Sequence, residues 1–122
     1  MDKIRVRAVI RKGNKFLLVK SNEEHNKGVW QFAGGNAESE DFLKEVKREI
    51  KEELGAELTN PKYAFTIKGR RGNVHYFTSK LKGKIKIDKN EIADYGWFNY
   101  NSAKNLSLSN TAKQALEKCK NS

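Results

Sequence analysis

Apolar and polar residues alternate along residues 3–11, which predicts a half-buried β-strand near the start of the chain. Its apolar side consists of Ile4, Val6, Ala8 and Ile10, and its polar side of Lys3, Arg5, Arg7 and Arg11. A turn at residues 12–14 separates it from a second apolar run at residues 15–20, so a hairpin is expected. The polar residues 21–28 predict a loop, and residues 29–33 a short third strand.

A helical period replaces the alternation in residues 40–54. This segment has no Gly or Pro and is rich in Glu, Lys and Leu, so it predicts a helix that ends at Gly55. Its apolar residues recur at helical spacing and should form one stripe that faces the core. They are Leu43, Val46, Ile50 and Leu54.

Two more strands and a second helix are expected in the C-terminal half. Residues 61–68 and 73–81 predict strands on either side of a basic turn at 69–72, and residues 84–87 allow a short further strand. The aromatic residues in these strands are interpreted as sheet packing rather than as a base-stacking platform, and His75 as a structural or surface residue. Residues 111–119 predict a helix with Ala112, Ala115 and Leu116 inward, capped by Ser109 or Asn110.

Length and composition suit one soluble domain, residues 1–122. Hydrophobic residues make up 37% of the 122 residues, and no apolar run approaches the roughly 20 residues that cross a bilayer. The first residues do not begin a signal peptide, so a cytoplasmic location is expected. The single cysteine, Cys119, cannot form an internal disulfide and is interpreted as a packing or surface residue.

The net charge of +10 leaves two interpretations open. Twenty-five Lys and Arg against fifteen Asp and Glu would attract a polyanion such as a nucleotide or RNA. The alternative is that the lysines simply cover solvated faces, since they are scattered along the whole chain.

The predicted first helix carries a second stripe that is entirely acidic. Glu45, Glu49, Glu52 and Glu53 lie three and four residues apart, although a helix built for solubility would place Glu before Lys at this spacing. Neighbouring glutamates repel one another, and a hard divalent cation such as Mg²⁺ or Mn²⁺ would offset that repulsion. The alternative is a solvated charged face.

The spacing of these residues resembles the signature of the Nudix hydrolases. Gly34, five residues, Glu40, seven residues and the run 48–56 (REIKEELGA) match G-x5-E-x7-R-E-U-x-E-E-x-G-U at every fixed position but the last. Upstream, this family commonly has W-x-F-P-G-G-x-x-E-x-G-E, and the chain has Trp30, Phe32, Gly34, Gly35 and Glu38 in that register. Ala33 replaces the proline, and the segment 38–40 is one residue shorter than the family's.

The resemblance implies an α/β (α+β mixed) Nudix fold, a mixed β-sheet packed between helices, and a pyrophosphohydrolase that uses Mg²⁺ or Mn²⁺. It makes Glu49, Glu52 and Glu53 metal ligands, together with a carbonyl of Gly34. It makes Glu49 the expected general base, Glu40 an assisting acid, and Arg48 the residue that orients the glutamates.

Further residues are expected at the site. A glycine turn before a helix N-terminus places backbone amides where phosphate can bind, so Gly34 and Gly35, with Glu38, are expected to contact substrate. The resemblance makes Glu91 an acid that reaches the metal or the attacking water, with Asp94 as the substitute. Asn110 would read a base or cap the last helix.

The expected substrate is a nucleoside diphosphate linked to another group, such as a (d)NTP. An RNA 5′ end is the alternative, and the basic charge favours either of these over an uncharged partner. A protein of another class, a non-catalytic nucleotide- or RNA-binding module, also stays open. No membrane partner is expected, and the sequence does not predict an oligomeric state.

Overall fold

The computed structural model describes residues 3–120 and contains strands, helices and one 3-10 turn. In chain order these are β1 (Arg5–Lys12), β2 (Lys15–Ser21), the 3-10 turn η1 (Glu24–Asn26), β3 (Trp30–Gln31), β4 (Ala33–Asn36), α1 (Phe42–Leu54), β5 (Glu57–Gly69), β6 (Gly72–Lys82), β7 (Ile92–Phe98), α2 (Tyr100–Ala103) and α3 (Asn110–Cys119). None of the helices in this part of the chain is long and apolar enough to cross a membrane.

The strands form one mixed sheet with β1 at its centre. Strand β1 pairs in parallel with β6 and antiparallel with β4 along its first half, and its end pairs with the start of β2 in the predicted hairpin. Strands β5 and β6 form a long hairpin on one side, while β3 and β7 flank β2 on the other.

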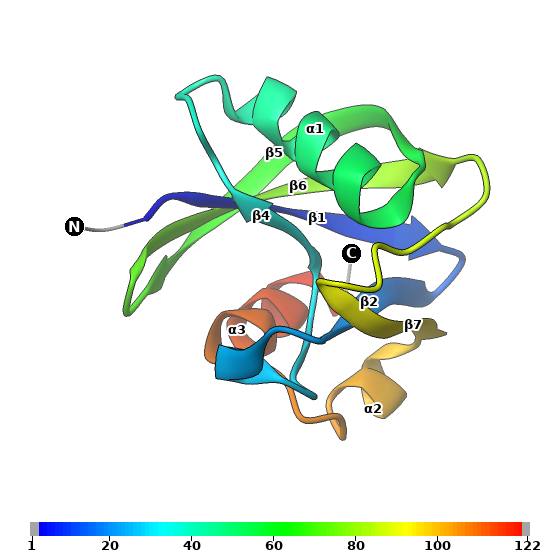
Figure 1. The fold of residues 1–122 in the computed structure, drawn as a ribbon. Coiled ribbons are helices and arrows are strands. Elements are labelled where there is room, and N and C mark those ends of the chain that lie inside the picture. Colours follow the sequence, from blue (N-terminus) through cyan, green and yellow to red (C-terminus); the bar gives the residue numbers. More distant parts are fainter. Residues whose placement is uncertain (1–2, 121–122) are drawn as a thin grey trace.

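Helices cover both faces of this sheet, with α1 on one side and α3 on the other (Figure 1). Each helix buries an apolar stripe in its own core cluster. In α1 these residues are Val46, Ile50 and Leu54, and in α3 they are Ala112, Ala115, Leu116 and Cys119. The predicted fold class, a mixed sheet packed between helices, is confirmed, and so is the inward face of the last helix.

The first strand is buried on both faces, so the expectation of a half-buried strand was wrong. Val6, Ala8 and Ile10 belong to the cluster under α1, whereas Val9 belongs to the cluster under α3. The reason is the position of β1: strands lie on both sides of it and helices on both faces, so no face is left for solvent.

Helix α1 begins at Phe42, two residues later than expected, because Asp41 caps it. The Asp41 side chain accepts a hydrogen bond from the Lys44 backbone N–H. Leu43, expected in the core, is 41% exposed, and the partly buried Phe42 packs against the core cluster instead. The helix ends at Gly55 in the left-handed conformation, as the sequence predicts.

Residues 84–87 form no strand, which corrects a further expectation. Their backbone groups bond to the end of α1 rather than to a neighbouring strand: Lys86 N–H donates to the Leu54 carbonyl at 2.7 Å, and Asp88 N–H to the Glu53 carbonyl at 2.9 Å. These bonds satisfy carbonyls that the last helical turn leaves free.

The remaining packing interpretations agree with the structure except at Tyr63, whose side chain is largely exposed. Cys119 is buried in the α3 cluster, and His75 stacks on Phe42 while its Nδ1 lies 2.8 Å from the Thr66 hydroxyl. Tyr76 and Phe77 are buried, whereas Tyr63 is exposed. The Ser109 side chain caps α3, and Asn110 is the first residue of that helix.

Candidate functional site

A cavity of about 590 Å³ lies where α1, β4, the start of β1 and the start of β7 meet. Acidic and basic side chains dominate its lining. The acids are Glu23, Glu38, Glu49, Glu52, Glu53 and Glu91, and the bases are Lys3, Arg5, Arg7, His25, Arg48 and Arg71. The cavity thus has an acidic wall, chiefly from α1, and a basic wall, chiefly from β1 and the tip of the β5–β6 hairpin.

The glutamates of α1 differ in how far they reach into the protein. Glu49 and Glu53 are four residues apart, so both point from one face of the helix, and they are only 9% and 7% exposed. Glu52 lies between them on the rim, with 57% of its side chain exposed. The sequence therefore brings two buried carboxylates and one exposed carboxylate to the same cavity.

The glycine pair shapes the floor under these carboxylates. Gly34 N–H donates a 3.0 Å hydrogen bond to Oε1 of Glu53. A Cβ on Gly35 would lie 2.2 Å from Oε1 of Glu49, so only glycine leaves room for that carboxylate. Any side chain at Gly34, whose φ is 153°, would collide with the Val6 carbonyl.

The expectation that this glycine pair leads into a helix N-terminus was wrong. Gly34 pairs with Arg7 and Gly35 with Val6 in the ladder between β4 and β1, so both glycines belong to a strand. The loop at residues 37–41 separates them from α1, and none of the first residues of α1 lines the cavity. The second half of α1 faces the glycines instead.

Burial and mutual repulsion make both inner carboxyls hold protons more tightly than usual. Burial raises the pKa of Glu49 to about 6 and that of Glu53 to about 8. Nearby carboxylates, including Glu91, push in the same direction, while Arg7 opposes the shift in both. A bound cation would relieve this cost, since it favours the ionised form of each group.

Arg48 holds the outer part of the acidic wall together. Its guanidinium lies 2.9 Å from Glu45, 3.4 Å from Glu49 and 3.1 Å from Glu52, and Nη2 also donates to the Asn36 carbonyl. These hydrogen bonds raise the pKa of the guanidinium above its already high usual value. The side chain that the resemblance assigns to orienting the glutamates thus contacts two of them and Glu45.

Glu45 and Arg7 are site residues that the sequence reasoning did not assign. Glu45 is 4% exposed, binds Arg48 and accepts a hydrogen bond from the Glu38 backbone N–H, so it fixes both. Its place on the acidic stripe, three residues before Arg48, could have indicated this role.

Arg7 is 6% exposed and lines the cavity, and its Nη1 donates a 2.7 Å hydrogen bond to the Phe32 carbonyl. Its Nε has no hydrogen-bond partner, and no carboxylate within the described residues 3–120 lies within 4.0 Å of it. No local pattern separates Arg7 from Arg5 or Lys3, so the sequence alone could not identify it.

Glu91 reaches the cavity from the start of β7, far along the chain from α1. Two backbone bonds fix its position: its N–H donates to the Asp88 carbonyl, and its carbonyl accepts from Asn22 N–H. Burial and the carboxylates of Asp88, Glu23 and Glu52 raise its pKa. Asp94, the substitute for Glu91, is exposed within β7 and does not line the cavity.

Glu40 and Asn110 lie outside this cavity. Glu40 is exposed in the loop before the Asp41 cap and lines a shallower depression beside Glu38. It is outside α1, so it does not share the face that carries Glu49 and Glu53. Asn110, at the start of α3, lines a separate basic cavity.

The donor set suits a hard divalent cation, although its members are spread along the wall. Within residues 3–120 no three His, Cys, Asp or Glu side chains converge on one point. Glu52 is half exposed and paired with Arg48, so its carboxylate can be redirected at little cost in solvation. The side chains that give this wall its charge are carboxylates, the oxygen donors that Mg²⁺ and Mn²⁺ prefer.

Two curated proteins resemble this chain in sequence. The NAD-capped RNA hydrolase NudC of Pasteurella multocida is 30% identical over 100 residues, which cover 76% of this chain and 36% of that protein. The CTP pyrophosphohydrolase of Escherichia coli is 33% identical over 76 residues, which cover 57% of this chain and 56% of that protein. The matched segments thus span between about a third and just over half of these relatives.

Solved structures share the fold along nearly the whole chain. The MutT NUDIX hydrolase from Burkholderia pseudomallei superposes with a TM-score of 0.84 at 20% identity, covering 98% of both chains. The family model described as NUDIX domain matches residues 1–119. The chain therefore belongs to the Nudix hydrolase family.

Proposed function

We propose that this protein is a metal-dependent pyrophosphohydrolase that cleaves the diphosphate linkage of a nucleoside diphosphate derivative. The single observation that carries the proposal is the two-walled cavity, in which Glu49, Glu52, Glu53 and Glu91 face Arg5, Arg7 and Arg71. A diphosphate bridged to a cation needs both walls, because its phosphate oxygens are negative and the cation is positive.

Nudix hydrolases generally use divalent metal ions, and the acidic wall suits one. Glu49, Glu52 and Glu53 would hold the ion with the Gly34 carbonyl as a further oxygen, and Glu91 would reach the ion or the attacking water. The raised pKa values of Glu49 and Glu53 support this assignment, because burial first, and repulsion between the carboxylates second, disfavour their ionised forms, which a bound cation would favour. Such an ion would neutralise charge on phosphate oxygens and lower the pKa of a bound water.

The protein's own groups would divide the remaining work. Arg7, buried and without a carboxylate partner among the described residues, would bind a phosphate oxygen, and Arg5 and Arg71 would extend that contact. Glu49, which the family resemblance makes the expected general base and whose carboxylate lines the cavity, would accept the proton of the attacking water. Arg48 would keep Glu49 and Glu52 in place.

The relatives support the class of substrate and leave its identity open. One is named a CTP pyrophosphohydrolase and another an NAD-capped RNA hydrolase, and both names describe nucleoside diphosphates linked to a further group. We therefore propose a nucleotide or nucleotide-capped substrate for this chain, with Mg²⁺ or Mn²⁺ as the cofactor.

A panel assay tests the proposal. Hydrolysis would be followed by chromatography of the products with Mg²⁺ and with Mn²⁺ across nucleoside triphosphates, dinucleoside polyphosphates, sugar nucleotides and 5′-triphosphorylated RNA. Turnover of at least one class is expected, with a loss of two or more orders of magnitude in Glu53→Gln. A non-catalytic binding module would bind members of the panel and release nothing from any of them.

Glu57→Gln is the matched control. Glu57 is an exposed acid at the start of β5, paired only loosely with Lys51 at 3.9 Å, and it lies outside the cavity. Glu57→Gln removes the same charge as Glu53→Gln. Because Glu57 lies outside the cavity, the metal assignment predicts that Glu57→Gln leaves turnover unchanged. Equal turnover in both variants would reject the assignment of Glu53.

A further inference from the structure

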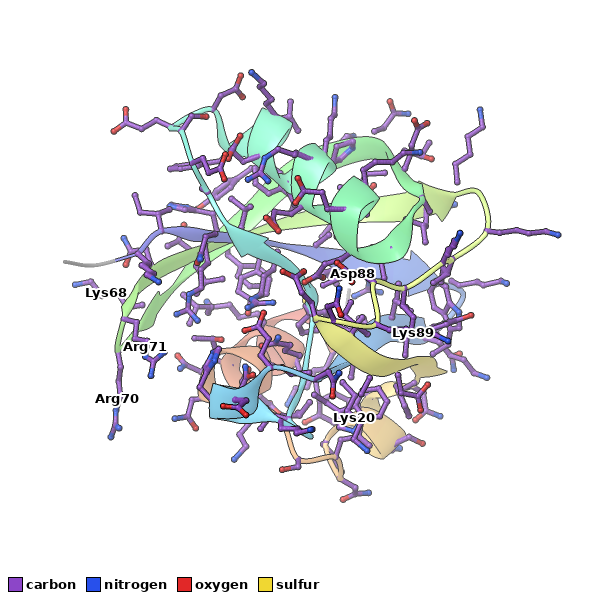
Figure 2. The ribbon with its side chains drawn as sticks, viewed as in Figure 1. Lys20, Lys68, Arg70, Arg71, Asp88 and Lys89 are labelled. Carbon is purple, nitrogen blue, oxygen red and sulfur yellow. The ribbon has the colours of Figure 1, made fainter. Side chains whose placement is uncertain are left out.

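A second cavity, of about 500 Å³, opens beside the first between the β5–β6 hairpin tip and the start of α3. Arg5 and Arg71 line both cavities, so the two adjoin at these side chains. Figure 2 shows Lys68, Arg70 and Arg71 projecting from the hairpin tip, where β5 turns into β6. We call the second cavity the basic groove.

The basic groove carries a high density of unbalanced positive charge. Its charged lining residues are Arg5, Lys68, Arg70, Arg71 and Lys113. No acid lines it, and within residues 3–120 none of these five forms an ion pair with a carboxylate. A run of like charges without counter-ions is a cost that an anionic ligand would relieve.

Arg5 lies at the junction and shows this cost most clearly. Its Nε is buried and has no hydrogen-bond partner among residues 3–120. Burial first, and then the neighbouring Arg7 and Arg71, lower the pKa of its guanidinium. Positive charge thus continues without a break from Arg7 in the first cavity to the basic groove.

The two cavities contain no aromatic side chain other than His25 among the described residues that line them. A site that recognises bases normally stacks them on aromatic rings. Cations without rings instead suit a phosphate backbone, which carries charge at every nucleotide and is bound without regard to sequence.

We propose that the basic groove binds the phosphodiester backbone of a single-stranded polynucleotide whose 5′ di- or triphosphate lies in the first cavity, between its acidic and basic walls. The inference rests on the proposed function and narrows its substrate to a 5′-polyphosphorylated strand such as an RNA 5′ end. A free nucleotide ends in an uncharged sugar and base beyond its phosphates, so it would leave Lys68, Arg70 and Lys113 unused.

A binding experiment without divalent metal tests the groove independently of catalysis. Fluorescence anisotropy would follow a labelled 5′-triphosphorylated RNA octamer in EDTA at several salt concentrations. Each phosphate neutralised on a single strand contributes about 0.7 to the slope of log K against log salt. Arg70→Gln combined with Lys113→Gln should lower that slope by about 1.4 and weaken binding roughly tenfold.

The matched control is Lys20→Gln combined with Lys89→Gln. Both lysines line neither cavity, and Figure 2 places them across the molecule from the hairpin tip. This variant loses the same charge as the groove variant. Because its lysines lie outside the groove, it should keep the slope of the unaltered protein to within about 0.3. An equal loss of slope in the two double variants would overturn the inference, because it would make the effect one of net charge.

Kinetics separate this inference from the proposed function. With Mg²⁺, kcat/KM should be about tenfold or more higher for a 5′-triphosphorylated tetramer than for the nucleoside triphosphate that matches its first nucleotide. The double variant Arg70→Gln with Lys113→Gln should lose this difference and keep the kcat/KM of the unaltered protein for the nucleoside triphosphate. Turnover that does not depend on strand length would overturn the inference and leave the proposed function standing. No turnover of any substrate would instead refute the proposed function, and the anisotropy result would then decide whether the groove binds a strand.

Discussion

The Cβ that Gly35 lacks would lie 2.2 Å from Oε1 of Glu49, so the carboxylate of α1 occupies the space that a side chain at this position of β4 would need. The next two nearest atoms at this position, Cδ at 2.6 Å and Oε2 at 2.9 Å, also belong to the Glu49 carboxyl group, which is the mobile end of a side chain. Gly35→Ala should therefore push the carboxylate aside without disturbing the backbone.

We expect Gly35→Ala to lower kcat by at least about tenfold and the free energy of unfolding by less than about 1 kcal/mol. Gly34→Ala should instead act mainly on stability. Its Cβ would lie 2.0 Å from the Val6 backbone carbonyl at a φ that L-residues rarely adopt, so a loss of about 3 kcal/mol or failure to fold is expected. Urea unfolding and steady-state kinetics of both variants check this, and a Gly35→Ala enzyme with full turnover would contradict it.

Glu53 should make the metal-free protein less stable as the pH rises. Its pKa is about 8 in the fold against a usual 4.5, so the folded state binds the proton more tightly than the unfolded chain. The stabilisation is therefore complete below pH 4.5 and lost as the pH rises through 8. Urea unfolding in EDTA should show a decrease on the order of 3 kcal/mol between pH 5 and pH 9.

Glu53→Gln provides the control for that pH dependence, since the amide resembles the neutral acid and does not titrate. Most of the decrease should disappear in this variant. Millimolar Mg²⁺ should stabilise the unaltered protein more at pH 9 than at pH 5, because the ion binds the ionised carboxylate. A decrease of the same size in Glu53→Gln would mean that other groups cause it.

Arg48 should be replaceable by lysine only in part. The guanidinium contacts Glu45, Glu49 and Glu52 as well as the Asn36 carbonyl, and a single ammonium cannot reach four partners in one plane. We expect Arg48→Lys to lower kcat about tenfold and Arg48→Ala about a hundredfold, with the apparent affinity for Mg²⁺ reduced in both. Equal kinetics for the lysine variant and the unaltered protein would show that only the charge matters.

The contrast between Glu40 and Glu45 is a further test. Glu40 matches the family signature but is exposed outside the cavity, whereas the buried Glu45 binds Arg48 and the Glu38 amide. We expect Glu40→Gln to change kcat by less than about threefold, and Glu45→Gln to lower it by about tenfold through a misplaced Arg48. Circular dichroism melting of both variants would exclude unfolding as the cause. The reverse order of effects would restore the role that the resemblance gives to Glu40.

The sequence predicts well what depends on local periodicity. The spacing of Val46, Ile50 and Leu54 fixes which side of α1 is buried, and the same spacing places Glu49 and Glu53 together on another side. The turn at Gly55 and the inward face of α3 follow equally from local signals, since each is decided within a few residues.

The late start of α1 has a local cause, the Asp41 cap, but the other expectations that failed depend on contacts between distant parts of the chain. Arg7 looked solvent-facing because an alternating strand can be central or peripheral, and only the pairing of β1 with β4 and β6 decides which. Likewise, Gly34 and Gly35 could have formed a turn, and their pairing with β1 makes them a strand. The roles assigned to the site residues stay predictions until the variants are measured.

The two backbone bonds that join residues 86 and 88 to the end of α1 couple acids that are far apart in sequence. Asp88 N–H donates to the Glu53 carbonyl, and Glu91 N–H donates to the Asp88 carbonyl. Main-chain hydrogen bonds therefore set the distance between the backbone positions that carry these two acids. An insertion in the link that follows β6 would therefore shift Glu91 relative to the helix while every charge is retained. The activity of this fold should tolerate many surface substitutions and very few changes in the length of that link.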